Sequence, residues 1–190
     1  MTRALILIDL INEFLHPEGK ISPQWMGQFC EEYRTIENVQ KLIKYFRENN
    51  EEIIWIRLGF HENYDNCSQI SPRFSWAQKM WILRENTWST EFLEELWYNP
   101  DEKTIIKTRI SPFYNTDLEE YLRQNDISEL VIAWVATDLA ISSVTRDAHD
   151  RDFHITVIND ACATISYDHH EAALIAIAKL GNVMNTSDII

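Results

Sequence analysis

Two charged residues that lie far apart in the sequence each follow an apolar run and could form one catalytic pair. Asp9 comes directly after the run ALILI, and Lys107 comes after two isoleucines. A carboxylate and an ammonium group at neighbouring strand ends would pair, which keeps both charged and lets the carboxylate accept a proton from a third group. The alternative is an ion pair that only closes the edge of a sheet. Spacing in the sequence does not decide between the two.

A third position of interest lies in the run VIAWVATDLAISS, residues 131–143, where a strand pattern ends at Ala-Thr-Asp and a helix pattern begins. The first amide groups of a helix have no partner within the helix and favour negative charge. A thiol at such a point would have a lowered pKa, and the same amides could stabilise a tetrahedral oxyanion. The residue at this point is Ala140, whose methyl group cannot act as a nucleophile.

Short β-rich runs alternate with helical patterns along the chain, interrupted by a long, irregular, tryptophan-bearing segment at about residues 59–100. Strands that are apolar throughout and joined by helices predict a parallel sheet covered on both faces. The expected strands are 4–9, 52–58, 104–107, 130–135, 155–159 and about 182–185, and the expected helices are 30–49, 116–125, 138–150 and 168–180.

The fold expected from this alternation is one α/β domain over residues 1–190: a three-layer α/β/α sandwich with a central parallel sheet of about six strands and Rossmann-type layering. No linker, repeat or low-complexity segment indicates a second domain. Ligands of such sheets bind outside the carboxyl ends of the strands. Asp9, Lys107 and residues 136–140 should therefore converge in space.

The composition limits the classes of partner. A formal net charge of −13 and a pI near 4.8 argue against nucleic acid or an anionic membrane, because both bind basic surfaces. The chain has no run of the ~20 apolar residues that span a bilayer, and it starts in a strand pattern rather than an export signal. A cytoplasmic location is therefore expected, and three cysteines without CxxC spacing fit reduced thiols. Neither GxGxxG nor GxxxxGK(S/T) occurs, so no nucleotide cofactor is expected.

Three stretches of the sequence resemble the motifs of the isochorismatase-like hydrolases, the cysteine-hydrolase group that includes nicotinamidases and N-carbamoylsarcosine amidases. They are DLINEFLHPEGKI, KTRISPFYNTDLEEYLR, and LVIAWVATDLAISSVTRDAHDRDF with the later VINDACAT. The resemblance covers nearly the whole chain, with the motifs in the family's order and spacing. It implies an α/β hydrolase that acts on a small-molecule substrate and assembles as a homo-oligomer.

The resemblance also implies roles for single residues. Asp9 matches the family's general base, Lys107 matches its catalytic lysine, and Ala140 stands at the position of the nucleophilic cysteine. The family has a non-proline cis peptide in this loop, which would fall between Val135 and Ala136. In the family this bond turns the loop amides, here those of Ala136 and Ala140, toward the carbonyl oxygen of the substrate.

The sequence departs from the family pattern at two positions. The cysteine is absent, and Trp134 replaces the glycine that usually precedes Val-Ala. The indole is expected either to form an altered pocket wall or to fill the core behind the site. Phe14 and Phe113, which lie in the first and second motifs, are expected to line the substrate pocket.

Three interpretations of the missing cysteine remain open. The chain is an engineered variant of a cysteine hydrolase, or a natural cysteine-free member that protonates a vinyl ether from Asp9 as the isochorismatases do, or a pseudoenzyme that only binds. Another cysteine in place of the missing one is a weaker hypothesis, because Cys162 in NDACAT fits a small buried thiol behind the site better.

No catalytic metal is expected. Nicotinamidases hold a metal with an Asp-x-His set, which has no match here, and His169 and His170 at a helix start fit solvated side chains better than ligands. The aromatic residues of segment 74–88 fit a satellite core or a subunit interface slightly better than direct substrate contact.

Overall fold

The computed structural model describes residues 2–22 and 27–190. Six strands form one sheet in the order β3-β2-β1-β4-β5-β6, and every neighbouring pair is parallel. The strands are β1 Thr2–Ile8, β2 Glu52–Leu58, β3 Lys103–Lys107, β4 Ile127–Val135, β5 His154–Ala163 and β6 Asn182–Met184. The parallel α/β fold predicted from the sequence is confirmed.

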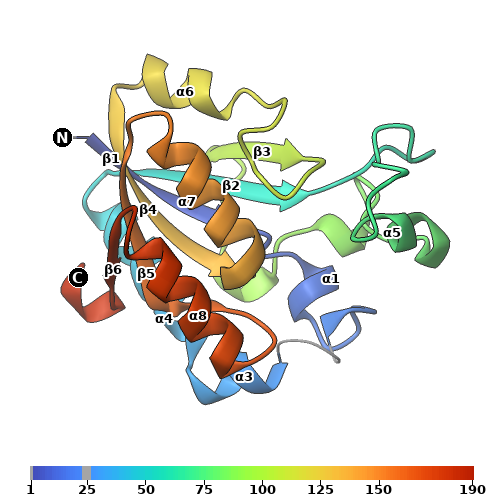
Figure 1. Ribbon diagram of the computed structural model, residues 1–190, viewed down its shortest axis with the longest axis horizontal. Helices are drawn as coiled ribbons and strands as arrows, with labels where there is room; N and C mark the ends of the chain where they lie inside the picture. The colour runs from blue at the N-terminus through green and yellow to red at the C-terminus, as the bar shows by residue number, and fades with distance from the viewer. Residues whose placement is uncertain (1, 23–26) are drawn as a thin grey trace.

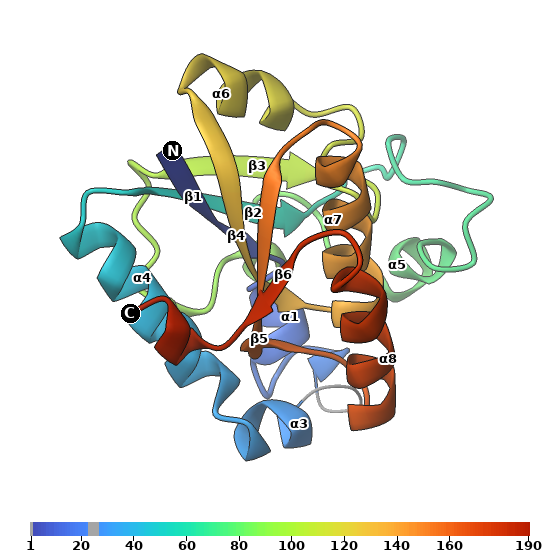
Figure 2. The same cartoon turned by 60° about the vertical axis from the view of Figure 1, so that its left-hand side comes forward.

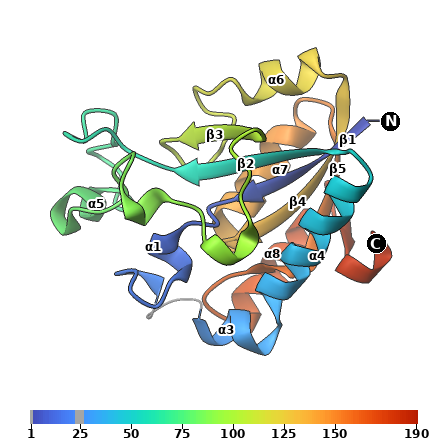
Figure 3. The same cartoon turned by 180° about the vertical axis from the view of Figure 1, so that it is seen from behind.

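Helices cover both faces of this sheet (Figures 1 and 2). Helix α4, Thr35–Glu48, packs on one face, and α7, Ser142–His149, and α8, Tyr167–Ile177, pack on the other. Figure 3 shows α4 from behind, crossing in front of the strands. Both faces of β1 are therefore buried, which explains why Ala4–Ile8 is apolar at every position.

The chain order places the switch point of the sheet between β1 and β4. Strands β2 and β3 follow β1 toward one edge, and β4, β5 and β6 continue toward the other. Crevices at such a point, outside the carboxyl ends of the strands, are where open α/β sheets bind ligands. The carboxyl ends of β1, β2 and β3 point to the side of the molecule where α1, Asn12–Leu15, and α5, Ser75–Met80, lie (Figure 1).

Two helices differ from the sequence prediction. The helix expected over 30–49 is two helices, α3 Gly27–Glu32 and α4, because Arg34 between them is left-handed with φ 51°. The helix expected over 138–150 begins with a wide π turn, η3 Thr137–Ile141, before α7. At both breaks the backbone conformation changes while the apolar pattern of the sequence continues. Periodicity alone could therefore not locate them.

Segment 59–100 is built from short pieces and not from long elements. It contains α5 and two 3₁₀ turns, η1 Trp88–Thr90 and η2 Glu94–Leu96. A bridge between Ile11 and Phe92 attaches this segment to the chain just after β1. Helix α6, Leu118–Gln124, precedes β4, and a 3₁₀ turn, η4 Thr186–Asp188, follows β6. No helix in the described ranges has the length and apolar character needed to cross a membrane.

Candidate active site

The three positions that the sequence predicted to converge do lie around one cavity of about 260 Å³. Asp9 follows β1, Lys107 ends β3, and the loop containing Ala136 and Ala140 follows β4. All four residues line the cavity, together with the predicted wall residue Phe14. This volume lies just below the ~300–1,000 Å³ range typical of ligand pockets, which fits a small molecule.

Asp9 is buried, and each oxygen of its carboxylate has a polar partner. Its Oδ2 lies 2.8 Å from the Nζ of Lys107, and its Oδ1 accepts a hydrogen bond of 2.8 Å from the backbone amide of Leu58. The Asp9 backbone has φ 61° in the left-handed region, and its own amide donates to the Ile56 carbonyl over 2.7 Å. This turn ends β1 and directs the carboxylate toward β2 and β3.

Lys107 is anchored on the side away from the carboxylate. Its Nζ donates to the backbone carbonyls of Arg109 and Ile110 over 3.4 and 3.3 Å, and its side chain is only 2% exposed. An ammonium group has three donors. Those of Lys107 meet one carboxylate and two carbonyls, so the position of its charge beside Asp9 is fixed.

Burial raises the pKa of Asp9 above its ordinary value, against the opposing effect of the Lys107 charge, the Leu58 amide and the Arg73 charge. Desolvation disfavours a charged carboxylate, so this group holds a proton more readily than an exposed aspartate does. A raised pKa makes the carboxylate a stronger base than an exposed aspartate, and its protonated form can return the proton. The pair is therefore suited to transferring a proton to and from a group in the cavity.

The loop after β4 has the cis peptide bond between Val135 and Ala136 that the resemblance implies. After it, the amides of Leu139 and Ile141 both donate to the Ala136 carbonyl, which closes the wide turn at the start of α7. Ala140 lies within this turn, 4% exposed, and faces the cavity. The position predicted for a nucleophile is present, and its side chain is a methyl group.

A buried histidine fixes this loop from behind. The Nε2 of His170 lies 2.8 Å from the side-chain oxygen of Asn159, and its Nδ1 lies 2.8 Å from the Thr137 hydroxyl. Since the amide oxygen of Asn159 is an acceptor, Nε2 carries the proton, and the hydroxyl donates to Nδ1. Burial lowers the pKa of His170. The expectation of a solvated side chain is wrong for His170, whereas His169 is exposed and bonds Ser166.

Two residues predicted to contact substrate do not line this cavity. The ring of Phe113 packs in the core between the sheet and α7, against Phe153 and beneath the guanidinium of Arg151. Trp134 is fully buried in the core behind the site. Its φ of 109° is a conformation that glycine adopts readily, which gives a physical reason for the glycine usual in the family.

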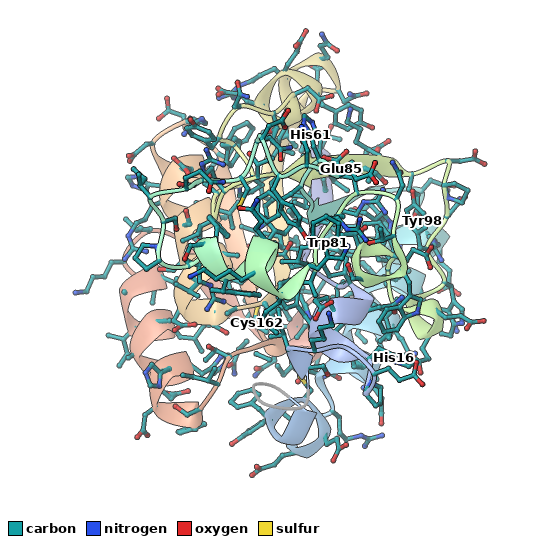
Figure 4. The ribbon with its side chains drawn as sticks, turned by 90° about the vertical axis from the view of Figure 1, so that its right-hand side faces the viewer. His16, His61, Trp81, Glu85, Tyr98 and Cys162 are labelled. Atoms are coloured by element: carbon teal, nitrogen blue, oxygen red, sulfur yellow. The ribbon has the colours of Figure 1, made fainter. Side chains whose placement is uncertain are left out.

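The sequence prediction missed part of the cavity wall. Arg73, Phe74 and Trp76 from segment 59–100 line the cavity, although a core or interface role was favoured for these aromatics. Trp81, by contrast, is 56% exposed and lies on the side of the molecule seen in Figure 4. In the sequence this segment stands out only as an aromatic-rich insertion. Its composition does not indicate which side chains face the cavity.

A second polar pair also escaped the sequence analysis. Asp138 and Thr164 both line the cavity, and the Thr164 hydroxyl donates to the Asp138 carboxylate over 2.5 Å. Thr164 follows β5, so this bond ties the end of β5 to the loop after β4. The pair lies at the same edge of the sheet as Asp9. In the sequence both residues belong to the third motif, but nothing there indicates that they bond to each other.

None of the three cysteines replaces the missing nucleophile. Burial raises the pKa of Cys162 and of Cys30 to about 12, and neither sulfur lines the cavity. Cys67 is also buried, and its Sγ contacts the Phe74 carbonyl. Among the residues at 2–22 and 27–190, no three histidine, cysteine or acidic side chains gather as a metal ion requires. The absence of a catalytic metal stays a prediction.

Fold and site together define a class of protein. It is a three-layer α/β scaffold in which a buried carboxylate–ammonium pair faces a cis-peptide loop and a helix start at the switch point of a parallel sheet. The isochorismatase domain model matches residues 3–188. The chain therefore belongs to the isochorismatase family of hydrolases.

Several known proteins are similar to this chain. A probable inactive nicotinamidase of Arabidopsis thaliana is 28% identical over 181 residues, which cover 94% of this chain and 89% of that protein. An isochorismatase-like hydrolase from Alkaliphilus metalliredigens superposes with a TM-score of 0.84 at 23% identity, over 100% of this chain and 97% of that one. N-carbamoylsarcosine amidase from Thermoplasma acidophilum gives 0.76 at 22% identity, over 98% and 97%. At these identities the two structures show a shared fold.

Proposed function

We propose that the cavity is the active site of a C–N hydrolase scaffold for a small amide or ureido compound, with its nucleophile position occupied by Ala140. The observation that carries this proposal is the placement of Ala140 in the same cavity as the Asp9–Lys107 pair and the cis-peptide loop. Two similar proteins support the substrate class, one named a probable inactive nicotinamidase and the other an N-carbamoylsarcosine amidase.

With a cysteine at position 140, the reaction would follow from the geometry. The Asp9 carboxylate would take the thiol proton, and the thiolate would attack the carbonyl carbon to give a tetrahedral oxyanion. Amides of the loop at Ala136 and residue 140 would stabilise that oxyanion. The C–N bond would break as Asp9 returns the proton to the leaving nitrogen. Asp9 would then activate the water that hydrolyses the thioester.

With Ala140 the thioester cannot form, so the chain is expected to bind such substrates without covalent turnover. The direct test is Ala140→Cys, assayed for ammonia release from a panel of small amides and ureido compounds. We expect a gain of at least about a hundredfold over the unaltered chain on one member of the panel. Ala140→Cys/Asp9→Asn is the matched control, since it keeps the thiol and lacks the base. If Ala140→Cys folds and gains no turnover on any compound, the proposal fails.

One observation favours a second function. Asp9 lines the cavity and burial raises its pKa, so a protonated Asp9 could donate a proton to a vinyl ether without any nucleophilic side chain. This function predicts that the unaltered chain releases pyruvate from isochorismate and that Asp9→Asn abolishes the release. Pyruvate release by the unaltered chain would establish this function in place of the first. A protein that only binds predicts activity in neither assay.

The assembly and location of the protein remain predictions. We propose a homo-oligomer in the cytoplasm that binds neither nucleic acid nor membrane, in keeping with the net charge of −13. Light scattering of the purified chain tests the oligomeric state, and a monomer at micromolar concentration would contradict that part of the proposal.

A further inference from the structure

Two polar residues of the second and third motifs lie outside the cavity and bond to each other. Ser111 lies in the loop after β3, and Asp147 lies on α7, which follows the loop containing Ala140. The hydroxyl of Ser111 donates a hydrogen bond to the carboxylate of Asp147. Neither side chain lines the cavity. Their bond instead joins the segment after Lys107 to a helix that covers the sheet.

The loop after β3 also holds the ammonium group of Lys107. Two acceptors of its Nζ are the carbonyls of Arg109 and Ile110, and these two residues directly precede Ser111. The two distances, 3.4 and 3.3 Å, exceed the ~2.7–3.2 Å usual for such bonds. A small displacement of the loop would therefore break them. The position of the charge beside Asp9 thus depends on what holds this loop.

The bond of Ser111 is part of a closed set of contacts, the clamp, formed by Ser111, Phe113, Asp147 and Arg151. The Nη1 of Arg151 donates to the Oδ1 of Asp147 over 3.1 Å. The same guanidinium lies over the ring of Phe113, with its central carbon 4.8 Å from the ring centre. The amide of Phe113 in turn donates to the hydroxyl oxygen of Ser111 over 3.2 Å. Each member contacts two others, so the clamp restricts the loop more than a single bond would.

The same loop also contacts the insertion. There the Nη1 of Arg109 donates to the backbone carbonyl of Asn66 over 3.0 Å. Several rotatable bonds separate this guanidinium from its own backbone, whereas the hydroxyl of Ser111 lies one carbon from the backbone. The clamp therefore fixes the neighbouring carbonyls more tightly than the contact with Asn66 does.

We infer that Ser111 and Asp147 are positioning residues, whose bond fixes the loop carbonyls and thereby keeps the ammonium group of Lys107 in place beside its carboxylate partner. Neither positioning residue would touch the substrate. The inference deepens the proposed function and rests on it only for the use of the ion pair in proton transfer. The position of the ammonium group is a property of the unaltered chain, so it can be measured without any reaction.

The consequence is measurable at Asp9. The charge of Lys107 lowers the pKa of Asp9 against the effect of burial. If the ammonium group is displaced, this lowering declines and Asp9 should titrate at higher pH. Any direct effect of removing the negative charge of Asp147 has the opposite sign, because a like charge near a carboxylate raises its pKa. The direction of the change therefore distinguishes lost positioning from a direct charge effect.

The test follows the ionisation of Asp9 by carboxyl-carbon NMR over a pH series in aspartate-labelled protein. The Asp9 signal is the one that is missing from Asp9→Asn. Ser111→Ala changes no charge and should move the Asp9 titration to higher pH, because the loop carbonyls lose their anchor. Asp147→Ala should move it in the same direction, and Ser111→Thr, which keeps the hydroxyl, should leave it in place. Arg73 and Asp138, whose charges also line the cavity, are unchanged in each of these proteins.

Two control variants separate positioning from general effects. Tyr121→Phe removes a hydroxyl that donates to the Glu52 carboxylate over 3.0 Å, at the amino end of β2 and thus at the other end of that strand from the cavity. Asp150→Asn removes a negative charge from an exposed residue just after α7. Neither should move the Asp9 titration. Urea denaturation gives the stability of every variant, and a purely structural role of the clamp would lower the stability of Ser111→Ala without moving that titration.

Three results would overturn the inference. The first is an Asp9 titration in Ser111→Ala at the same pH as in the unaltered chain. The second is an equal shift in Tyr121→Phe, and the third is a shift to lower pH in Asp147→Ala. Ser111→Ala replaces one half-buried hydroxyl by a hydrogen atom, so the test does not depend on the folding of Asp147→Ala.

Turnover separates this inference from the proposed function. In a chain with Ala140→Cys, Ser111→Ala should lower kcat about tenfold and leave KM within about twofold, because proton transfer is impaired and the cavity wall is unchanged. If Ala140→Cys turns over nothing while the Asp9 titration moves in Ser111→Ala, the positioning role stands and the amidase proposal fails. If Ala140→Cys is active and Ser111→Ala moves neither the titration nor kcat, the function stands and the positioning role fails.

Discussion

Two regions form the walls of the cavity, and they are built in different ways. The strand-end wall consists of Asp9, Lys107 and residues 135–140, and sheet hydrogen bonds and buried polar partners fix each of them. The insertion wall consists of Arg73, Phe74 and Trp76, and the segment that contains it is bridged at Phe92 to Ile11, outside the strands of the sheet. The first wall has the groups that could transfer a proton, and the second has the groups that would select a ligand. Substitutions in the two walls should therefore change different measurements.

The largest expected effect is on stability, from breaking the ion pair of the strand-end wall. Lys107→Met leaves the Asp9 carboxylate buried without its cation, which should cost about 3–5 kcal/mol of unfolding free energy. Removing the cation raises the pKa of Asp9 further. Because the folded state then binds the proton more tightly than the unfolded state, the cost should be small near the ordinary carboxylate pKa and grow as the pH rises.

Urea denaturation of Lys107→Met at several pH values from about 4 to 8 measures this cost. The control is Asp9→Asn/Lys107→Met, which removes both charges and keeps an oxygen for the Leu58 amide. Replacing a buried ion pair as a unit is often neutral or stabilising. If the double variant is as unstable as Lys107→Met at pH 8, the instability does not come from an unpaired buried charge. The pair would then be a structural element, and the contrast between the strand-end wall and the insertion wall would fail.

A smaller loss is expected at Trp134, behind the same wall. Trp134→Gly relieves a backbone with φ 109°, worth about 1–3 kcal/mol, and leaves a cavity in the core that costs about 3–5 kcal/mol or more. The net result should be a destabilisation of about 2 kcal/mol in urea denaturation. Ligand affinity should change little, because the indole does not line the cavity. A tenfold change in ligand affinity without loss of stability would mean that Trp134 is part of the pocket wall.

The strand-end wall could be predicted from the sequence because strand topology decides it. Apolar runs locate the strand ends, and parallel strands bring those ends together, so Asp9, Lys107 and Ala140 were placed correctly. Side-chain direction in loops has no such rule. Phe113 was expected in the pocket, yet it packs in the core between the sheet and α7. Trp134 was expected in the pocket wall or in the core behind the site, and it fills the core. Positive φ at Trp134 and Arg34 depends on tertiary contacts, which local patterns do not contain.

The insertion wall was the part that could not be predicted, and a pair of tryptophans tests it most directly. Trp76 lines the cavity, whereas Trp81 of the same segment is 56% exposed and contacts Arg84 through its ring. Trp76→Ala should weaken binding of benzamide, a small aromatic amide, about tenfold, because an aromatic wall of a small pocket is lost.

Trp81→Ala should leave that affinity unchanged, since its ring is mostly in solvent. Neither change should alter the pH dependence of stability, which belongs to Asp9 in the other wall. Equal affinity losses in both tryptophan variants would mean that the segment acts through its overall folding and not through the side chains that face the cavity. Selection of the ligand would then have to lie at the strand ends, together with the chemistry, and the separation of the two walls would be wrong.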